Sequence, residues 1–392
     1  MTVHLVYVNG RGVDTTTSIA REVSERLAAH HPVTVHHPNS PTTICPEPGD
    51  VLIGHPNRYD DDSVFNRSFR QKGWSRRIVF APFSHGLLDD AALIDGFVRE
   101  ADVYLAITGS YWFDAMEDTP VSHWRFKTRR CGLGIRRDHF PLIKKTFNPP
   151  GQRRFLYIGN ADPMRGGDFL ARLADTNPHL HLGWIRASDS RDCLDVIDGR
   201  GTKALRTVME RSRLVRHEAV HWRRPEGLPL VLSHDFILGC SRSDALNCDI
   251  LEAVAWGLVP VATPQCGLPA AEWLTHIPLD DVRGASEILD RMNLCSTDEL
   301  LNRQQRASAA LERDYNWDGV AQQVREAIEA PLEVEPHDRA FQHRKAGNVT
   351  ALRRIARRNR IETAIERALN LARPTRRVFG IMARAAGYRP RS

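Results

Sequence analysis

The chain has 392 residues, of which 42% are hydrophobic and 26% charged, values that are ordinary for a soluble globular protein. No stretch approaches the roughly 20 apolar residues that span a bilayer, and the N-terminus lacks the basic region and cleavage pattern of a signal peptide. The length suits two domains of ordinary size, and we expect a cytoplasmic protein.

The net charge of +6 is unevenly distributed along the chain. Residues 339–392 contain 15 Lys and Arg against 2 Asp and Glu, a net charge of +13, which leaves −7 on the other 338 residues. The seven cysteines are scattered and never form a CxxC pair, which argues against a disulfide framework and against a structural zinc site. The basic character therefore belongs to a C-terminal tail.

Residues 1–148 alternate short apolar runs with amphipathic stretches, the pattern of a parallel, doubly wound α/β sheet. The expected strands are 3–8, 33–36, 50–54, 77–83 and 102–107, and the expected helices are 18–29 and 91–99. Residues 123–142 are less regular. The run Phe147-Asn148-Pro149-Pro150-Gly151 predicts a linker.

The alternation starts again after the linker, which predicts a second α/β domain over residues 152–315. Its expected strands are 154–159, 179–185, 219–222, 235–240 and 259–263, and its expected helices are 167–174, 203–211, 228–233, 250–256, 285–292 and 298–315. A further helix is expected at 318–330, before the break at Pro331–Pro336. Residues 331–392 form a basic helical tail, in which Ile361, Ile365, Ala368 and Ala372 share one face.

Two acids, Asp244 and Glu252, bracket a loop between an expected strand and an expected helix of the second domain. A carboxylate suits the vicinal hydroxyls of a sugar, and exposed loop amides at a helix start suit phosphates. Arg165 follows the first strand of this domain beside glycines, where a fixed cation suits a diphosphate. The alternative is that all three are solvated surface residues.

Two further candidates follow strands of the first domain. Gly12 lies in a loop that opens the first helix, where glycine allows close approach of a phosphate, although a tight turn without a ligand fits equally. His85 directly follows another expected strand and could contact a sugar or act in proton transfer, or serve as a hydrogen-bonded structural residue.

We expect no metal site. Asp60-Asp61-Asp62 contains the DxD pattern found in some metal–nucleotide sites but is typical of a solvated loop. The pairs His217-x3-His221 and His179-x-His181 lack a third ligand in the sequence and are interpreted as structural.

Several motifs occur together in the second half. They are Gly159…Arg165-Gly166, Asp244-x7-Glu252-Ala253, Ala255-x-Gly257-x-Val259-Pro260-Val261-Ala262-Thr263, Gly267-x-Pro269 and Tyr315-Asn316-Trp317-Asp318. In this order they resemble the donor-binding half of retaining GT-B glycosyltransferases, similar to glycosyltransferase family 4. The resemblance covers roughly residues 1–330. It implies two doubly wound Rossmann-like domains facing a cleft, with an acceptor domain over 1–148, a donor domain over 152–315 and a helix over 316–330 that crosses back.

The resemblance implies roles for individual residues. Glu252 matches the family glutamate that binds ribose hydroxyls, Asp244 the acid that contacts the sugar, and Arg165 a cation for the diphosphate. The implied catalytic residues are His85, Asp244 and Arg165. The implied nucleotide-sugar site comprises Gly12, Asn160, Arg165, Asp244, Ala245, Leu246, Asn247, Cys248 and Glu252.

Two positions depart from the family pattern. Asp244 is one methylene shorter than the family's glutamate, and Asn160 stands where the family usually has a second arginine. Losing one charged hydrogen bond costs roughly 1.5–3 kcal/mol, a deficit that Arg186 or Arg242 could offset.

The implied function is metal-independent, retaining transfer of a hexose from a nucleotide-diphosphate sugar to an acceptor hydroxyl, in cell-envelope, polysaccharide or glycolipid synthesis, with no cofactor. The alternatives are a non-catalytic nucleotide-sugar-binding or partner subunit, a sugar-nucleotide epimerase, and a phage-type nucleic-acid glycosyltransferase that uses the tail. For the tail we expect a peripheral contact with an anionic membrane surface, ahead of a solvated appendage or oligomer contact and of nucleic-acid binding.

Overall fold

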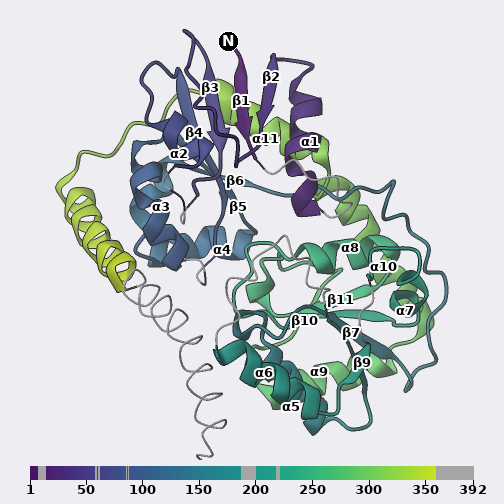
Figure 1. Ribbon diagram of the computed structural model, residues 1–392. Helices are drawn as coiled ribbons and strands as arrows, with labels where there is room; N and C mark the ends of the chain where they lie inside the picture. The colour runs from purple at the N-terminus through teal and green to yellow at the C-terminus, as the bar shows by residue number, and fades with distance from the viewer. Residues whose placement is uncertain are drawn as a thin grey trace, which may run out of the picture.

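Two sheets, one in each half of the chain, organise the molecule (Figure 1). The computed structural model describes residues 1–7, 15–57, 60, 62–84, 86, 88–186, 200–217 and 221–358. Within these ranges each sheet has six strands, and every strand pairing is parallel.

The first sheet is formed by residues 3–131. Its strands are β1 (Val3–Val6), β2 (Val33–His36), β3 (Val51–Gly54), β4 (Arg76–Pro82), β5 (Val103–Ile107) and β6 (Thr128–Cys131), in the order β2-β1-β3-β4-β5-β6. The helices are α1 (Thr15–Leu27), α2 (Val64–Phe69), α3 (Leu88–Glu100) and α4 (Ser110–Ala115). Strands β3 and β5 are buried along their whole length, as expected for central strands covered on both faces.

The second sheet repeats this architecture. Its strands are β7 (Arg154–Ile158), β8 (His181–Ile185), β9 (Val215–His217), β10 (Phe236–Gly239), β11 (Val259–Ala262) and β12 (Thr275–His276), in the order β12-β11-β10-β7-β8-β9. The helices are α5 (Gly167–Thr176), α6 (Arg200–Arg211), α7 (Leu228–Leu232), α8 (Cys248–Trp256), α9 (Val282–Leu294) and α10 (Thr297–Asp314). The two domains share buried contacts, among them Phe140 against Trp256, with ring centroids 5.2 Å apart.

The structure corrects the strand expected at 219–222. The strand here is β9, which ends at His217, while Trp222 lies in a turn and residues 218–220 fall outside the described ranges. It also adds β6 within the irregular segment 123–142. Because β6 lies at the sheet edge and reads Thr-Arg-Arg-Cys, it carries little of the apolar pattern on which strand prediction depends.

The chain returns to the first domain after the second is complete. Helix α11 (Trp317–Glu329) packs against α1 and against β4, β5 and β6 (Figure 1). Asn316 caps it, accepting from the amide of Gly319 at 2.7 Å. The amide of Gly132 donates to Gln323 Oε1 at 2.9 Å, so β6 is tied to this helix as well as to β5.

The tail begins as a helix over residues 339–358 that lies beside the first domain (Figure 1). Leu352 is buried in the first-domain core, Phe341 meets Phe126 edge-on with ring centroids 5.9 Å apart, and Asn348 donates to Ser122 Oγ at 2.9 Å. The shared face predicted at Ile361–Ala372 lies outside the described residues. In the described part of the chain, no helix combines the length and apolarity that crossing a membrane would require.

Candidate functional site

The candidate site lies at the carboxyl ends of β7 and β10, the edge at which open α/β sheets bind ligands. After β7 the chain makes a short turn of 3-10 helix, Pro163–Arg165, which ends at Gly166 with φ of +71°. A Cβ at Gly166 would lie 1.8 Å from the carbonyl oxygen of Cys240, just after β10. Only glycine therefore lets the loop that carries Arg165 approach the loop that carries Asp244 this closely.

Arg165 and Asp244 form an ion pair across these two loops. Arg165 donates through an Nη to Asp244 Oδ2, and the side chain of Asp244 is only 14% exposed. The carboxylate raises the pKa of the guanidinium further above its ordinary value, so the arginine stays charged. Burial raises the pKa of Asp244, and Arg165 opposes that rise. The structure thus brings together the cation and the acid that the sequence singled out.

Glu252 is fully buried at the middle of α8, and it bonds Thr15 of the first domain. Its Oε1 accepts from the backbone amide of Thr15 at 2.9 Å and from the Thr15 hydroxyl at 2.8 Å, while its Oε2 accepts from Arg223 Nε at 2.6 Å. Arg223 also donates to Asp249 at 2.6 Å. Burial raises the pKa of Glu252, with Arg223 opposing the rise. Both carboxylate oxygens are therefore occupied by protein groups in this structure.

The loop from Ala245 to Cys248 lies in the interface between the domains. The amide of Gly109 donates to the Ala245 carbonyl at 2.8 Å, and Trp112 Nε1 donates to the Asp244 carbonyl at 2.7 Å. Leu246 is buried, Cys248 is half-buried, and Asn247 caps α8 by accepting from the Ile250 amide at 3.1 Å.

One of the loop amides expected to meet phosphates is engaged within the protein: the amide of Asn247 donates to the Cys266 carbonyl at 3.1 Å. The amide of Asp244, just before the loop, donates to the Gln265 carbonyl at 2.9 Å.

The proposed sources of a second positive charge differ in position. Asn160 is exposed at the end of β7. Arg242 is paired with Asp168 and with Asp280, each with a closest contact of 2.6 Å. Arg186 also has partners within the protein. In this conformation Arg242 is ion-paired with two neighbouring acids and does not offer a second charge for a diphosphate.

Gly12 and His85 both lie outside the described residues, but their neighbours contact the second domain. Thr15 bonds Glu252, as above. Ser243 Oγ donates to Ser84 Oγ at 2.8 Å and accepts from the Gly86 amide at 2.5 Å. The first-domain loops flanking both candidates therefore adjoin the loop of Asp244 and the helix of Glu252.

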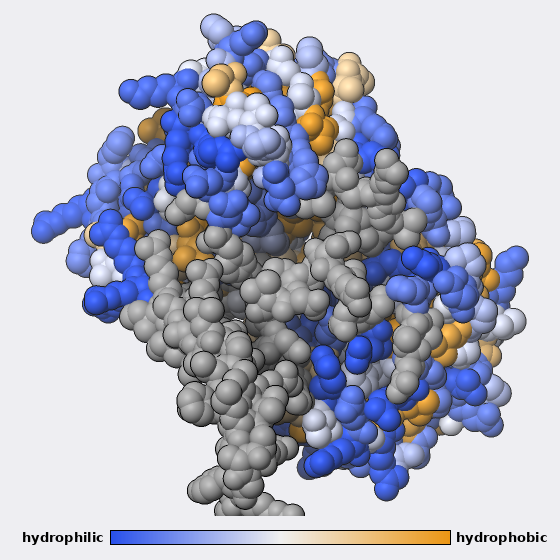
Figure 2. Space-filling model, viewed as in Figure 1, coloured by the Kyte–Doolittle hydropathy of each residue, from blue (hydrophilic) through white to orange (hydrophobic). Residues whose placement is uncertain are grey.

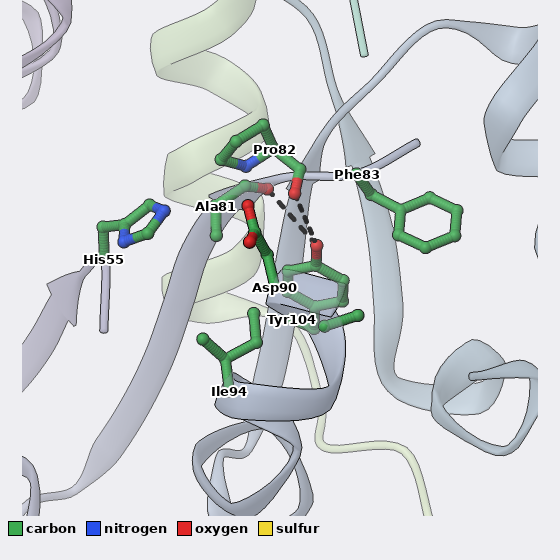
Figure 3. Close-up of a pocket in the computed structure, with 8 residues that line it drawn as sticks. His55, Ala81, Pro82, Phe83, Asp90, Ile94 and Tyr104 are labelled. Atoms are coloured by element: carbon green, nitrogen blue, oxygen red, sulfur yellow. Dashed lines mark hydrogen bonds between the residues drawn. The ribbon is translucent and has the colours of Figure 1, made fainter. Parts of the chain in front are cut away.

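A small cavity lies beside the end of β4 in the first domain (Figure 3). His55 and Asp90 face it from opposite sides, and the Tyr104 hydroxyl below donates to the carbonyls of Ala81 at 3.4 Å and Pro82 at 3.3 Å. Burial raises the pKa of Tyr104 above its ordinary range. With about 20 Å³ of room, the cavity suits a single water molecule rather than a sugar.

The acidic run at 60–62 bonds its own backbone where it is described. Asp60 Oδ1 accepts from the Asp62 amide at 2.9 Å, and Asp61 lies outside the described ranges. Among described side chains, a cluster of three or more potential metal ligands occurs elsewhere, at His181, His217 and His234.

Comparison with protein-family models and with curated protein sequences finds no match. Solved structures are similar over most of the chain. Sucrose-phosphate synthase from Thermosynechococcus elongatus has a TM-score of 0.59 and 14% identity, covering 83% of this chain and 97% of its own. This similarity extends over both sheets and the connection between them. The fold is GT-B.

Two further GT-B structures were solved with ligands. The catalytic domain of starch synthase IV from Arabidopsis thaliana, bound to ADP and acarbose, has a TM-score of 0.56 and 10% identity, covering 83% of this chain and 98% of its own. HepE from Anabaena, in complex with UDP and glucose, has a TM-score of 0.54 and 12% identity, covering 84% of this chain and 100% of its own.

Sequence reasoning missed Thr15, Arg223 and Trp112 as members of the site. Thr15 and Trp112 come from the first domain and donate hydrogen bonds to Glu252 and Asp244 of the second. The partners are 237 and 132 residues apart in the sequence, and no local pattern predicts such a contact. Arg223 lies 29 residues before Glu252, and this spacing gave no signal by itself.

Proposed function

We propose that this chain is a retaining glycosyltransferase that moves a hexose from a nucleotide-diphosphate sugar to an acceptor hydroxyl. The observation that carries the proposal is the convergence of Arg165, Asp244 and Glu252 on the domain interface of a GT-B fold. A cation, a sugar-facing acid and a ribose-facing acid are the groups that such a donor requires.

In the proposed reaction Arg165 stabilises the diphosphate as negative charge develops on it. Once Asp244 is released from it, the guanidinium offers a permanent positive charge and hydrogen-bond donors, the role that a divalent ion has in metal-dependent transfer. Asp244 exchanges its bond with Arg165 for hydroxyls of the donor sugar. The contact of the domains through Gly109, Trp112 and Ser243 excludes water and so favours transfer over hydrolysis.

Glu252 binds the ribose hydroxyls in this proposal. Thr15 donates twice to one of its oxygens, so in this proposal the ribose hydroxyls replace Thr15 there and the domains separate at this point. Arg223 stays on the other oxygen and keeps the carboxylate charged and oriented.

The test is release of nucleoside diphosphate from a panel of uridine, adenosine, guanosine and thymidine diphosphate sugars, after a thermal-shift screen of the same panel. A donor that binds only the folded protein raises the midpoint. Glu252→Gln should lower kcat/KM at least tenfold, because one charge-assisted bond is worth roughly 1.5–3 kcal/mol. Added Mg²⁺ or Mn²⁺ should leave the rate unchanged, and the product anomer, read by NMR, should match that of the donor.

Asp235→Asn is the matched control. Asp235 is also a fully buried carboxylate of the second domain, but it lies at the amino end of β10, where it bonds Asn148 and the Arg154 amide. Its variant should lose stability and keep kcat/KM per folded molecule. If no donor shifts the midpoint and none is turned over, the proposal is wrong.

For the tail we propose attachment to an anionic membrane surface, which suits a glycolipid or cell-envelope acceptor. In its helix over residues 339–358, Phe341 and Leu352 pack against the first domain while Arg353, Arg354 and Arg357 are exposed, and before the helix Leu332 and Val334 are exposed. On the face seen in Figure 2, hydrophilic residues cover most of both domains and hydrophobic ones occur only in small separate patches. The proposed attachment is therefore electrostatic rather than by insertion.

A further inference from the structure

Three histidines that are far apart in the sequence lie together in the second domain. His181 begins β8, His217 ends β9, and His234 lies between α7 and β10. One ring nitrogen from each falls within 4.8 Å of the other two. The ring centroid of His234 is 5.4 Å from that of His181 and 5.5 Å from that of His217.

The hydrogen bonds of His234 determine which nitrogen points into the cluster. Its Nδ1 lies 2.9 Å from the carbonyl oxygen of Leu230. A carbonyl can only accept, so Nδ1 carries the proton and Nε2 has a bare lone pair. His234 is 1% exposed, and within the described part of the chain its Nε2 has no hydrogen-bond partner. A carbonyl that fixes the tautomer of a ligating imidazole is a usual feature of metal sites.

His217 supplies a second unsatisfied nitrogen at the same place. Its Nε2 is buried and also lacks a hydrogen-bond partner among the described residues. Two buried ring nitrogens thus lack partners at one place among the described residues, and a buried polar atom without a partner is destabilising. A shared cation satisfies both lone pairs at once.

Gly183, in the middle of β8, keeps the space between these nitrogens open. A Cβ there would lie 2.5 Å from His234 Nε2 and 3.3 Å from His217 Nε2. Glycine inside a strand often marks a position that something else approaches closely. Here what approaches is the pair of imidazole nitrogens.

The cluster offers nitrogen ligands alone, one from each of the three histidines. Arg154 is the nearby cation, and its charge opposes the binding of a metal ion here. Imidazole ligands without carboxylates suit zinc, copper or nickel rather than magnesium or calcium.

We propose that His181, His217 and His234 bind one divalent transition-metal ion, zinc in the first instance, that joins β8, β9 and the α7–β10 connection. Three protein ligands leave a fourth position for water. His234 precedes β10 and Asp244 follows it, so the ion lies away from the proposed transfer site. Its role is to stabilise the second domain.

The test uses the full, untagged chain, stripped with chelator and then dialysed against zinc, with bound metal measured by mass spectrometry. We expect about one zinc per chain, and a Co²⁺-loaded sample with the visible absorption of a four-coordinate site. His234→Ala and, in case that variant fails to fold, His217→Gln should each weaken zinc binding at least tenfold.

His276→Ala and His179→Ala are the controls. His276 is a partly buried histidine of β12 whose Nε2 also lacks a partner among described residues but which belongs to no group of three potential ligands there. His179 is exposed and bonded to Asp290 at 2.7 Å. Both should bind zinc as the wild type does. Less than stoichiometric zinc, or zinc that the His217 and His234 variants retain, would overturn the proposal.

The metal site and the transferase can fail separately. Glu252→Gln should keep its zinc, and zinc-free His217→Gln should still release nucleoside diphosphate below its unfolding temperature. If a chelator slows the wild type, the same chelator should have no effect on His217→Gln, which assigns the effect to this ion.

Discussion

Glu252 is an acid held wholly inside the protein by groups from both domains. A buried carboxylate is tolerated where cations and donors satisfy its oxygens, and Arg223 and Thr15 do so here. Removing the carboxylate would leave Arg223 with only one of its two carboxylate partners, so truncation to alanine mixes lost binding with lost stability. Changes on the Thr15 side avoid this problem.

Thr15→Ala should bind the nucleoside diphosphate of the active donor about tenfold more tightly. The substitution removes the hydroxyl that bonds Glu252 Oε1 while the backbone amide stays, and a competing charged hydrogen bond of about 1.4 kcal/mol corresponds to a factor of ten. Calorimetry on the folded variant measures the change.

Thr15→Ser keeps the hydroxyl and should bind as the wild type does. Weaker binding by Thr15→Ala would mean that Thr15 assists the ribose instead of competing with it, and would contradict the prediction.

At the scale of single residues, the sequence indicated the acids and the cation but not their partners. Asp244, Glu252 and Arg165 follow strand ends in a motif with fixed spacing, which is local information. The pairing of Glu252 with Thr15 depends on how two domains meet. The sequence also did not predict that His234 lies beside His181 and His217. The order of strands in the sheet brings these three together, and their spacing along the chain does not reveal it.

Among the elements, α11 shows how one close contact sets the packing of a helix. Trp317 begins α11, and a Cβ at Gly134 would lie 2.5 Å from Cγ of its indole. The amide of Ile135 donates to the Tyr315 carbonyl at 2.8 Å, so the backbone beside Gly134 runs against the start of the helix with no room for a side chain.

Gly134→Ala should therefore lower the free energy of unfolding by roughly 1–3 kcal/mol, the usual cost of overpacking. Gly96→Ala is the matched control, since Gly96 lies inside α3 and a Cβ there meets nothing within 4 Å. It should stabilise by roughly 0.5–1 kcal/mol through helix propensity. Thermal and urea unfolding measure both, and equal midpoints would contradict the packing argument.

The strands and long helices were predictable because burial on both faces leaves apolar runs, and amphipathic helices keep a 3.6-residue period. Helices α2 and α4 were missed; each has six residues and shows that period only weakly, although α7, with five residues, was predicted. The β9 segment was misplaced because an edge strand of three residues, Val-Arg-His, is less apolar than the turn containing Trp222 that follows it.

At the scale of the whole molecule, the net charge is uneven: residues 339–392 are basic, and the rest of the chain is acidic. The apolar side of residues 339–358 is used within the protein, so the arginines on its other side are what a partner would meet.

The variant Arg353→Gln, Arg354→Gln and Arg357→Gln should bind anionic vesicles far more weakly, at about 1 kcal/mol per arginine near the surface. The control is Arg283→Gln, Arg306→Gln and Arg313→Gln, which removes three exposed charges from the second half of the chain. Cosedimentation with phosphatidylserine vesicles at low and high salt measures the difference. Equal losses in both variants, or tighter binding to DNA than to vesicles, would contradict the membrane proposal.

The return of α11 to the first domain makes the order of synthesis matter. The strands of the first sheet are complete at Cys131, but the helix that covers β4–β6 starts at Trp317. At roughly 5–20 residues per second, a ribosome needs on the order of 10–40 s to make the intervening chain. During that interval an apolar face of the nascent first domain has no cover, which makes it a natural substrate for chaperones. The second domain is therefore synthesised before the first domain has its last covering helix.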